Sequence, residues 1–579
     1  MANKDADSGR LADTLAWMRA HEWWVVAGFA LLAFLMGLAG AWLHFRAEGM
    51  TAQLHDLAYL SLRLFGLDYD LEGPDGLPYA PSNWLLQSAR FLAPGVLAYG
   101  LFRLIFLAVR DMFSLFSISD WKDHAVICGA GERGKRLALT LVEQYHRVVM
   151  MEKDEENENL LELREAGIKV VIGSATDPLH QKEARLAQAS LVAAVLPNPQ
   201  SNVEISIEAA KVMRQYRRIN PDAGEASIHA HVPRELAEVF ENEPPFSNST
   251  DGVQCRFFDH HATAARTLAL DTIKRLVPGF LDKPRAPRIL IAGNERFPAS
   301  FAAQILPLLQ LPNCGVPEIE IVSDDIDVIR KRLPVAHPQL NLVANLQLEQ
   351  MERGQILSCD SRGRCGEWFR QPHDIVVIAF NDDFDSLKFA RSIQQLCSGN
   401  GAPATEVIVG LRPTSNLMRL QSDSDKSTTR YGRLVDLIEL GCSSQVVFDQ
   451  TIDRGARSAH ENYLGSISGD ESYGQSESHR PWDTLAEEFK NSNRRLVDHN
   501  QIKQVILKAD RSNDMIEALS EAEHRSWTAE RIVGGWRHHQ VRDDAKRLHP
   551  DIVPYGDLSE KAKDKDRKNV RAVLAPTES

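Results

Sequence analysis

The chain has few cysteines, and nothing in their spacing would pair them. Its 579 residues include seven cysteines without a single CxxC, and Cys359 and Cys365 flank DSRGR with no histidine pair at zinc spacing. This pattern argues against a metal site and against a disulfide scaffold, and it fits a reducing compartment. The cysteines are Cys128, Cys255, Cys314, Cys359, Cys365, Cys397 and Cys442.

Basic charge and enzyme motifs are also missing. The net charge of -13 argues against a nucleic-acid partner, because phosphate binding needs a basic surface. The sequence contains no G-x-x-x-x-G-K-[ST], no G-x-S-x-G and no H-E-x-x-H. We therefore expect no catalytic residues and no enzymatic activity.

One long apolar run lies near the N-terminus. Residues 23–43 read WWVVAGFALLAFLMGLAGAWL, which is 21 residues without a charge. At about 1.5 Å per residue, a helix of this length spans roughly 30 Å, the thickness of a bilayer core. The run is longer than the core of a signal peptide, so it predicts a retained transmembrane helix at 21–45. Ala33, Gly37 and Ala41 are spaced by four, which would let another helix approach closely.

A second apolar run, 91–109, reads FLAPGVLAYGLFRLIFLAV and contains Arg103 as its only charge. It predicts a second span at 84–112, in which Arg103 either reaches the interface or lines a pore. Two spans place both chain ends on one side, and the acidic loop between them favours a cytoplasmic N-terminus. Residues 1–20 are then a cytoplasmic tail, and residues 46–83 an extracytoplasmic loop with a short membrane-associated helix.

The loop between the spans lacks the filter of a potassium channel. A filter such as TVGYG lines up consecutive backbone carbonyls, whereas this loop offers only FGLDY at 65–69, in which Leu67 and Asp68 fit poorly. Selective potassium conduction is therefore not expected. Two spans cannot enclose a pore alone, so we expect a homo-oligomer, a dimer or a tetramer, in contact with the lipid of a bacterial inner membrane.

A glycine motif opens the soluble part. The segment HAVICGAGERGKR, residues 124–136, contains Gly129, Gly131 and Gly134 as G-x-G-x-x-G directly after an apolar run. The first glycine permits a tight turn, the second a close approach to a pyrophosphate, and the third close packing of helix on strand. The helix N-terminus suits phosphates. Glu152 ends the next strand, 18 residues after Gly134, where an acid would bond ribose hydroxyls.

Further apolar strands follow, which is typical of a parallel α/β sheet: GIKVVIGSATD, LVAAVLPNPQSN, SIHAHV and VQCRFFD. On CGAGERG, MMEKD, GSATD and the turn ending in Asn202, residues 124 to about 270 resemble a TrkA-N domain, also called an RCK domain, of potassium channels and transporters. The resemblance implies a domain at 120–275 that binds NAD(H) or an adenine nucleotide, ATP or ADP, and regulates ion flux. His260 and His261 follow the last strand and are expected to be solvated turn residues.

The motif and the resemblance together predict one cofactor site at this sheet edge. Ser174 departs from the family pattern, because it stands where the family usually has the Asp of GDAT, which helps to hold the adenosine. The predicted cofactor-binding residues are Gly129, Gly131, Glu132, Arg133, Gly134, Glu152, Asp154 and Ser174.

The pattern restarts near Arg288, where RILIAGNERF resembles HAVICGAGER and EIEIVSDD resembles the strand that ends in an acid. This predicts a second, degenerate RCK-like domain at 285–450. Gly293 remains, but Phe297 and Pro298 stand where the third glycine would be. We expect this unit to pack against the first rather than to bind a phosphate.

A polar, glycine- and serine-rich stretch at 465–480 predicts a flexible insertion. Around it, HENY, SNR, EHRSW, ERIVGGW, HPDIVPY and LSEKAKDKD resemble the RyR domain, the repeat named for ryanodine receptors. The resemblance covers 455–579 and implies a mainly helical sensor domain for a nucleotide-derived second messenger. Its predicted pocket consists of Trp527, Arg531, Trp536 and Tyr555, which could equally be packing residues of a helical core.

The fold class predicted is a membrane α-helical part with two spans, followed by α/β Rossmann-like tandem RCK domains and a mainly α-helical RyR domain. The leading hypothesis is a nucleotide sensor at the membrane, in which cytoplasmic ligand binding gates ion flux or permeability. Two alternatives stay open. One is a non-conducting sensor or scaffold that signals to a partner, and the other is an NAD-dependent oxidoreductase.

Overall fold

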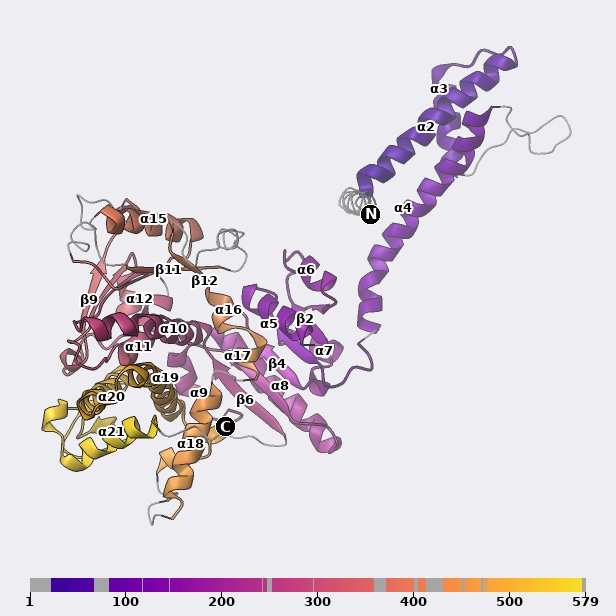
Figure 1. Ribbon diagram of the computed structural model, residues 1–579. Coiled ribbons are helices and arrows are strands. Elements are labelled where there is room, and N and C mark those ends of the chain that lie inside the picture. Colours follow the sequence, from indigo (N-terminus) through magenta and orange to yellow (C-terminus); the bar gives the residue numbers. More distant parts are fainter. Residues whose placement is uncertain are drawn as a thin grey trace, which may run out of the picture. The chain divides into compact units, whose positions relative to one another are not determined.

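The chain forms two compact units, Met1–Ser117 and Ile118–Ser579 (Figure 1). The computed structural model describes residues 22–574 apart from 67–82, 117, 145, 242, 247–251, 295, 359–370, 400–404, 413–430, 450–452, 470–472 and 475. The predicted N-terminal tail, the end of FGLDY, and Cys359 and Cys365 lie outside these residues.

The first unit is helical. Two of its helices are long and apolar enough to cross a membrane, over Trp24–Ala47 and Trp84–Arg103, which agrees with the two predicted spans. A short helix lies between them in sequence, at the place where the sequence predicts one. The elements are α2 (Glu22–Ala47), α3 (Leu54–Arg63), the 3-10 turn η1 (Leu64–Gly66) and α4 (Trp84–Phe116).

Small residues allow these helices to pack closely. A Cβ added to Gly40 would lie 2.7 Å from the backbone nitrogen of Leu86, and one added to Gly37 would lie 2.9 Å from Leu64. Ala33 is fully buried beside them. The close approach predicted from the spacing of small residues is therefore confirmed.

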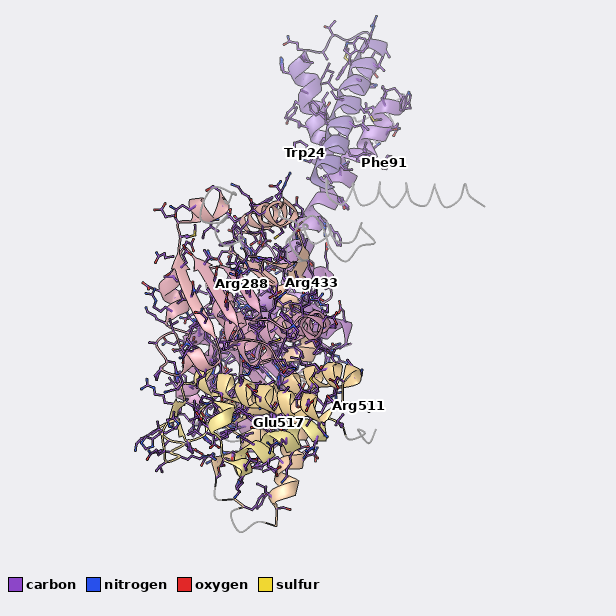
Figure 2. All side chains as sticks on the ribbon, turned by 60° about the vertical axis from the view of Figure 1, so that its left-hand side comes forward. Trp24, Phe91, Arg288, Arg433, Arg511 and Glu517 are labelled. Atoms are coloured by element: carbon purple, nitrogen blue, oxygen red, sulfur yellow. The ribbon has the colours of Figure 1, made fainter. Side chains whose placement is uncertain are left out.

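The outer surface of this unit is apolar. Trp24 and Phe91, labelled in Figure 2, are 75% and 77% exposed. Exposed apolar side chains are costly in water but stable against lipid tails, so this surface suits a bilayer. Other exposed large apolar residues of α2 and α4 are Phe29, Leu31, Leu32, Leu35, Trp42, Leu97, Leu101, Phe102 and Ile105.

The second unit begins with a six-stranded, wholly parallel sheet in the order β3-β2-β1-β4-β5-β6, which is the Rossmann order. The strands are short and mostly buried on both faces, which explains their continuous apolar sequences. They are β1 (Ala125–Cys128), β2 (Val148–Glu152), β3 (Lys169–Ile172), β4 (Leu191–Ala194), β5 (Ala226–His231) and β6 (Val253–Phe258). The helices between them are α5 (Glu132–Glu143), α6 (Leu160–Glu165), α7 (Pro178–Glu183), α8 (Pro199–Ile219) and α9 (Arg234–Phe240).

A second six-stranded parallel sheet repeats this order as β9-β8-β7-β10-β11-β12. Two Rossmann-like sheets are thus present where the sequence predicts two α/β units. The strands are β7 (Arg288–Gly293), β8 (Glu318–Ser323), β9 (Asn345–Gln350), β10 (Ile375–Ala379), β11 (Glu406–Leu411) and β12 (Arg433–Asp436). Helices α11 (Phe297–Leu308), α12 (Ile326–Arg330), α13 (Arg353–Leu357) and α15 (Asp383–Gly399) accompany them.

The two sheets are interlocked through their connections. Helix α10 (His260–Asp282) links them, and after β12 the chain returns to the first sheet as α16 (Leu437–Gly441) and α17 (Ser444–Val447). Cys442 and Val447 belong to the hydrophobic core of the first sheet, and the backbone nitrogen of Ser444 donates to Thr140 Oγ1 at 3.0 Å. The segment that follows the second sheet therefore contributes residues to the core of the first sheet.

The C-terminal region is mainly helical and shares a core with the second sheet. Residues from α10, α11, β7, β10 and the C-terminal helices form one hydrophobic cluster that includes Ile506, Leu519, Trp536 and Val570. This region therefore packs tightly against the second sheet. Its helices are α18 (Arg454–Ile467), α19 (Glu487–Ala509), α20 (Asn513–Val533) and α21 (Glu560–Ala572), with a 3-10 turn η7 (Trp482–Thr484) and the short strands β13 (Arg537–His538) and β14 (Leu548–His549).

Buried ion pairs reinforce this junction. Arg266 of α10 donates to Asp498 of α19 at 2.6 Å and to Asp453 at 2.9 Å. Burial alone would raise the pKa of Asp453, but the positive charges of the neighbouring Arg494 and Arg266 hold this pKa at about 2. The predicted insertion at 465–480 differs from a plain loop, because α18 extends to Ile467 and a 3-10 turn spans Glu477–His479.

Candidate nucleotide site and its surroundings

The glycine loop joins β1 to α5 at the carboxyl edge of the first sheet. Gly129 has φ +106°, a left-handed conformation that glycine adopts without strain. A Cβ added to Gly134 would lie 1.8 Å from the carbonyl oxygen of Gly129, whereas one added to Gly131 would meet nothing within 4 Å. The first and third glycines are thus required by the backbone, and the second borders open space.

The first turn of α5 offers backbone amides to that open space. No side chain caps the helix at its N-cap residue Gly131, and the first helical hydrogen bond runs from Lys135 N to Gly131 O. The amides of the preceding helical residues are left for an external acceptor. A helix N-terminus of this kind binds phosphate through its amides and its dipole.

Glu152 lies at the end of β2, against this loop. Its Oε2 accepts from the backbone nitrogen of Ala130 at 2.6 Å, and its Oε1 accepts from the nitrogens of Lys153 and Asp154 at 2.8 and 3.0 Å. A carboxylate offers about four acceptor positions, so one remains for a ligand hydroxyl. Glu152 therefore holds the loop in place and still presents an acceptor to a ligand.

Asn159, which precedes α6, was not foreseen from the sequence. It is buried, and its side-chain amide donates to the carbonyl oxygen of Ala130 at 2.9 Å. The Ala130 residue is therefore fixed on both sides, by Glu152 at its N–H and by Asn159 at its C=O. No motif pointed to Asn159, because its role depends on a contact 29 residues away in sequence.

The remaining predicted residues fall into two groups. Asp154 and Ser174 lie just beyond the ends of the neighbouring strands β2 and β3, and Gly173 N donates to Glu152 O at 2.7 Å. Glu132 opens α5, where burial raises the pKa of its carboxyl. The structure thus brings the loop, Glu132, Glu152, Asp154 and Ser174 to one sheet edge.

Arg133 points away from this group, toward β4 and β5. Its Nη1 lies 2.7 Å from His231 Nδ1, and its Nη2 donates to Leu196 O at 3.3 Å. His231 in turn lies 2.8 Å from His260 through their ring nitrogens. Arg133 therefore connects the glycine loop to the first residue of α10, a link that no spacing in the sequence could indicate.

The expectation that His260 is a solvated turn residue is wrong. His260 does follow β6 directly, but it is only 5% exposed and it contacts His231. Burial, followed by the charge of Arg133, lowers the pKa of His231 to about 2, and burial also holds the pKa of His260 well below its usual range. Both rings are neutral at pH 7.

His231, Asp259 and His260 could together hold a metal ion, since their ligand atoms lie within 4.8 Å of one another. Two neutral imidazoles and a carboxylate are a usual ligand set. The guanidinium of Arg133 competes with such an ion, because it contacts His231 Nδ1 at 2.7 Å. Because the positive charge of Arg133 already occupies that position, we interpret the cluster as a network of polar side chains rather than a metal site.

Among the described residues, the loop after the first strand of the second sheet shows no comparable open space. A Cβ added to Gly293 would lie 2.2 Å from Ala379 O, so this glycine serves strand packing. Phe297 and Pro298, at the start of α11, are both buried. Bulky side chains thus occupy the start of this helix, which agrees with the expected loss of a phosphate site.

The predicted residues of the C-terminal pocket lie together. The guanidinium of Arg531 lies 4.7 Å from the ring of Trp536 and 5.7 Å from the ring of Trp527. Trp536 is a core residue at 2% exposure, whereas Tyr555 lies at one end and donates to Glu517 at 3.1 Å. Trp536 therefore serves packing, and Arg531 is the charged group that lies against both indole rings.

Arg531 keeps a donor that no described residue satisfies. Its Nη1 is buried without a hydrogen-bond partner within the described chain, and its Nε, also without a hydrogen bond there, lies 3.6 Å from the carboxylate of Glu530. Burial lowers the pKa of the nearby His549, which packs edge-on against Trp527, to about 4. A guanidinium between two indoles, with a free donor and a neutral histidine beside it, suits an anionic group on a planar ligand.

Comparison with known families identifies both regions. Residues 125–226 match the TrkA-N domain, and residues 500–576 match the RyR domain. The chain carries these two domains. The resemblance read from the sequence is therefore confirmed, and the TrkA-N match runs from β1 to the first residue of β5, across the whole predicted cofactor site.

The likeness to solved structures is more distant. A structure described as GsuK bound to ADP has 14% identity and a TM-score of 0.38, over 74% of this chain and 99% of that chain. The GsuK channel bound to NAD has 15% identity and a TM-score of 0.39, over 79% and 85% of the two chains. No curated protein matches the chain.

Proposed function

We propose that this protein is a nucleotide sensor of the bacterial inner membrane, in which NAD(H), ATP or ADP bound at the first glycine loop controls an ion pathway or the permeability of the membrane. The loop binds and releases its ligand without catalysing a reaction. The two apolar helices anchor the chain in lipid, and both chain ends lie in the cytoplasm. Because two helices per chain cannot enclose a path, the working form is a homo-oligomer, a dimer or a tetramer.

One observation carries this proposal. Within a matched TrkA-N domain, the uncapped amides of α5 border open space above Gly131, and Glu152 is held beside them by Ala130 N at 2.6 Å. These are the parts that a dinucleotide or an adenine nucleotide needs: donors for its phosphates, a glycine that permits close approach, and an acceptor for its ribose.

The contacts of Arg133 supply a route by which the ligand can act elsewhere in the second unit. A phosphate on the first turn of α5 lies next to Arg133, whose side chain contacts His231, and His231 contacts the first residue of α10. Further along α10, Arg266 is paired with Asp498 of α19. A ligand that binds one arrangement of this chain of contacts more tightly than another shifts the population toward it.

The RyR domain is the second sensor in this proposal. Arg531, between Trp527 and Trp536, holds the anionic part of a nucleotide-derived second messenger, and the half-buried Trp527 supplies aromatic surface to its base. The shared core between this region and the second sheet means that a ligand here acts on the same rigid body.

Two variants test the proposal directly. Gly131→Asp places a carboxylate where the phosphates would lie, in a position with room for a side chain and an ordinary φ of -69°. Asn294→Asp adds the same charge at the second loop and keeps the oxygen that accepts from Asn381 N. We expect Gly131→Asp to lose nucleotide affinity at least 100-fold, a cost of about 3 kcal/mol, while Asn294→Asp binds as the parent does.

The same pair of variants separates conduction from signalling. The full chain in liposomes should show ion flux that changes with nucleotide, and Gly131→Asp should abolish the change. Flux that is absent under all conditions, with nucleotide binding intact, would favour the non-conducting sensor or scaffold. The missing glycine-rich filter in the sequence is the observation that favours this second candidate.

A further inference from the structure

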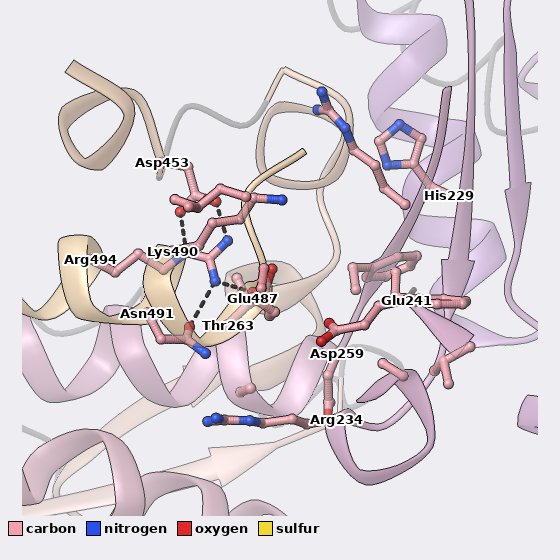
Figure 3. A pocket seen from close by; sticks show the side chains of 18 of the residues that line it. His229, Arg234, Glu241, Asp259, Thr263, Asp453, Glu487, Lys490, Asn491 and Arg494 are labelled. Carbon is pink, nitrogen blue, oxygen red and sulfur yellow. Dashed lines mark hydrogen bonds and ion pairs between the residues drawn. The ribbon is translucent and has the colours of Figure 1, made fainter. Parts of the chain in front are cut away.

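A cavity that is partly open to solvent lies between the first sheet and the C-terminal region, away from the glycine loop (Figure 3). Its volume is about 250 Å³. One wall consists of α9 and β6, and the opposite wall consists of η7 and the first two turns of α19. The residues of α19 that line it, Glu487, Lys490, Asn491 and Arg494, recur at the spacing of one helical face.

The cavity separates two small hydrophobic clusters that do not merge. Phe246 and Phe257 belong to the cluster of the first sheet, and Trp482 and Leu485 belong to the cluster of the C-terminal region. All four line the cavity. An apolar body placed here would therefore join the two clusters, which the protein's own side chains do not do.

Most charged groups around the cavity are already paired with one another. Only the unpaired ones can therefore hold a ligand by charge. The ion pairs among the lining residues and their neighbours are Arg256–Asp483, Arg494–Asp453, Arg494–Glu487, Arg266–Asp453, Arg266–Asp498, Arg234–Glu238 and Arg480–Glu477. Asp259 also lines the cavity, but its carboxylate is engaged as the N-cap of α10, where it accepts from His261 N at 2.9 Å.

Lys490 and Glu241 are the exceptions, one on each wall. Within the described chain, no carboxylate oxygen forms an ion pair with Lys490 Nζ, which lies 5.9 Å from the ring of Trp482; Glu487, one turn earlier on α19, acts on Lys490 through its charge. The Glu241 carboxyl likewise has no donor among the described residues, and Lys490 and Arg234 act on it through their charges without forming an ion pair. Figure 3 shows Glu241 with the residues of the first sheet and Lys490 with those of α19.

The environment of both groups is costly for an unpaired charge. Burial, then the charges of Glu487 and Glu238, raise the pKa of Glu241 to about 7. Burial likewise lowers the pKa of Lys490. A ligand that brings a partner to each group would remove this cost.

We propose that this cavity binds a small zwitterion with an apolar body, of the chemical class of an apolar or aromatic α-amino acid. Its carboxylate pairs with Lys490, its ammonium pairs with Glu241, and its side chain fills the space between Trp482 and Phe257. Apart from Asp259, whose carboxylate caps α10, the two groups without an ion-pair partner among the described residues carry opposite charges, so the occupant is neutral overall. This excludes a multiply phosphorylated nucleotide as the occupant.

The test measures binding to the purified full chain in detergent, by calorimetry, with L-phenylalanine as the first probe and L-leucine, L-methionine and L-tryptophan as further probes. Phenethylamine and 3-phenylpropionate, which lack the carboxylate and the amine respectively, serve as matched ligands. We expect at least one of the four amino acids to bind. If phenylalanine binds, its affinity should be at least tenfold higher than that of phenethylamine or 3-phenylpropionate.

Two variants locate the site. Lys490→Met and Glu241→Gln should each weaken amino-acid binding at least tenfold, whereas Lys211→Met and Glu208→Gln, which alter an exposed pair on α8, should not. Each variant is checked for folding by its nucleotide binding at the glycine loop. The proposal is overturned if no amino acid binds, if binding survives in both cavity variants, or if a nucleotide displaces the amino acid competitively.

Discussion

The two sheets share one strand order, yet in the described part of the chain an open glycine loop is seen at the first sheet and not at the second. At the first edge, Gly131 borders empty space and Gly134 lets α5 lie against the Gly129 carbonyl. At the second edge, Gly293 still permits close strand packing, but Phe297 and Pro298 fill the start of α11. The fold therefore requires only that helix and strand backbones pack closely, whereas a phosphate site also requires free space in front of the helix N-terminus. Topology alone therefore does not imply a ligand.

The helices that follow the two loops also differ in their surroundings. Helix α11 is buried along most of its length and shares a core with α10 and α20, whereas α5 keeps half-exposed positions. The helix that follows the first strand of the second sheet packs against the C-terminal region instead of bordering a ligand site. Four changes would sharpen or break this contrast, from the largest expected effect to the smallest.

Gly134→Ala should have the largest effect. Its Cβ would lie 1.8 Å from the Gly129 oxygen, so α5 must move off β1, and we expect a loss of about 3 kcal/mol in stability. Pro298→Ala, the corresponding change at the second loop, should cost only about 1 kcal/mol. Thermal unfolding in detergent measures both. Equal effects at the two loops would contradict the contrast.

Glu152→Ala should come next. It removes acceptors for Ala130 N, Lys153 N and Asp154 N as well as the ribose partner, so nucleotide affinity should fall about 10- to 100-fold, as expected for charge-assisted hydrogen bonds of about 1.5–3 kcal/mol. Ser323→Ala, at the end of β8, is the matched change in the second sheet and should leave affinity unchanged. Calorimetric titration with NADH and with ATP provides the measurement.

The two carboxyls with raised pKa values, Glu241 and Glu406, should respond to replacement by glutamine in opposite ways. Glu241 has no ion-pair partner among the described residues and a pKa of about 7, so its contribution favours folding below its unfolded pKa and is lost as the pH rises through about 7. Glu241→Gln should therefore stabilise the chain above pH 7, by about 1 kcal/mol after allowance for solvent screening.

Glu406 of the second sheet is the matched control. Burial raises the pKa of this carboxyl as well, but Arg275 lies 2.7 Å from it. Glu406→Gln should destabilise the chain, because it leaves Arg275 and Arg433 without this partner. Unfolding temperatures at pH 5.5 and pH 8 test the pair of variants, and a stabilisation by both would remove the distinction.

Ser174→Asp should have the smallest effect. It restores the acid that TrkA-N domains usually carry after the third strand, at the edge where Glu152 also lies. We expect adenosine-containing ligands to bind about 2- to 5-fold tighter, which corresponds to about 0.5–1 kcal/mol. Ser174→Asn serves as the uncharged control. Weaker binding by Ser174→Asp would place Ser174 beside a phosphate rather than the adenosine.

Much of the fold could be predicted because its signals are local. Runs such as HAVICG and RILIAG read as buried parallel strands, and the charge-free run at 23–43 reads as a span, so both sheets and both long helices were expected. The glycine motif likewise located the loop, since its spacing reflects backbone geometry within six residues.

The rest depends on contacts between distant segments. Asn159 pins Ala130 from 29 residues away, and Arg133 reaches His231 from 98 residues away, and neither has a sequence signature. His260 looked like a surface residue because it follows a strand, yet α16 packs over it and a Cβ on Gly441 would lie 2.1 Å from its oxygen. The common core of the second sheet and the C-terminal region could not be predicted for the same reason.

The most direct test is an experimental structure of the assembled full chain with the nucleotide it binds. The account predicts ligand density that contacts the amides at the start of α5 and the carboxylate of Glu152, with no density at the start of α11. Density at Asn294 to Pro298, or an empty first loop in a chain that binds nucleotide, would contradict it.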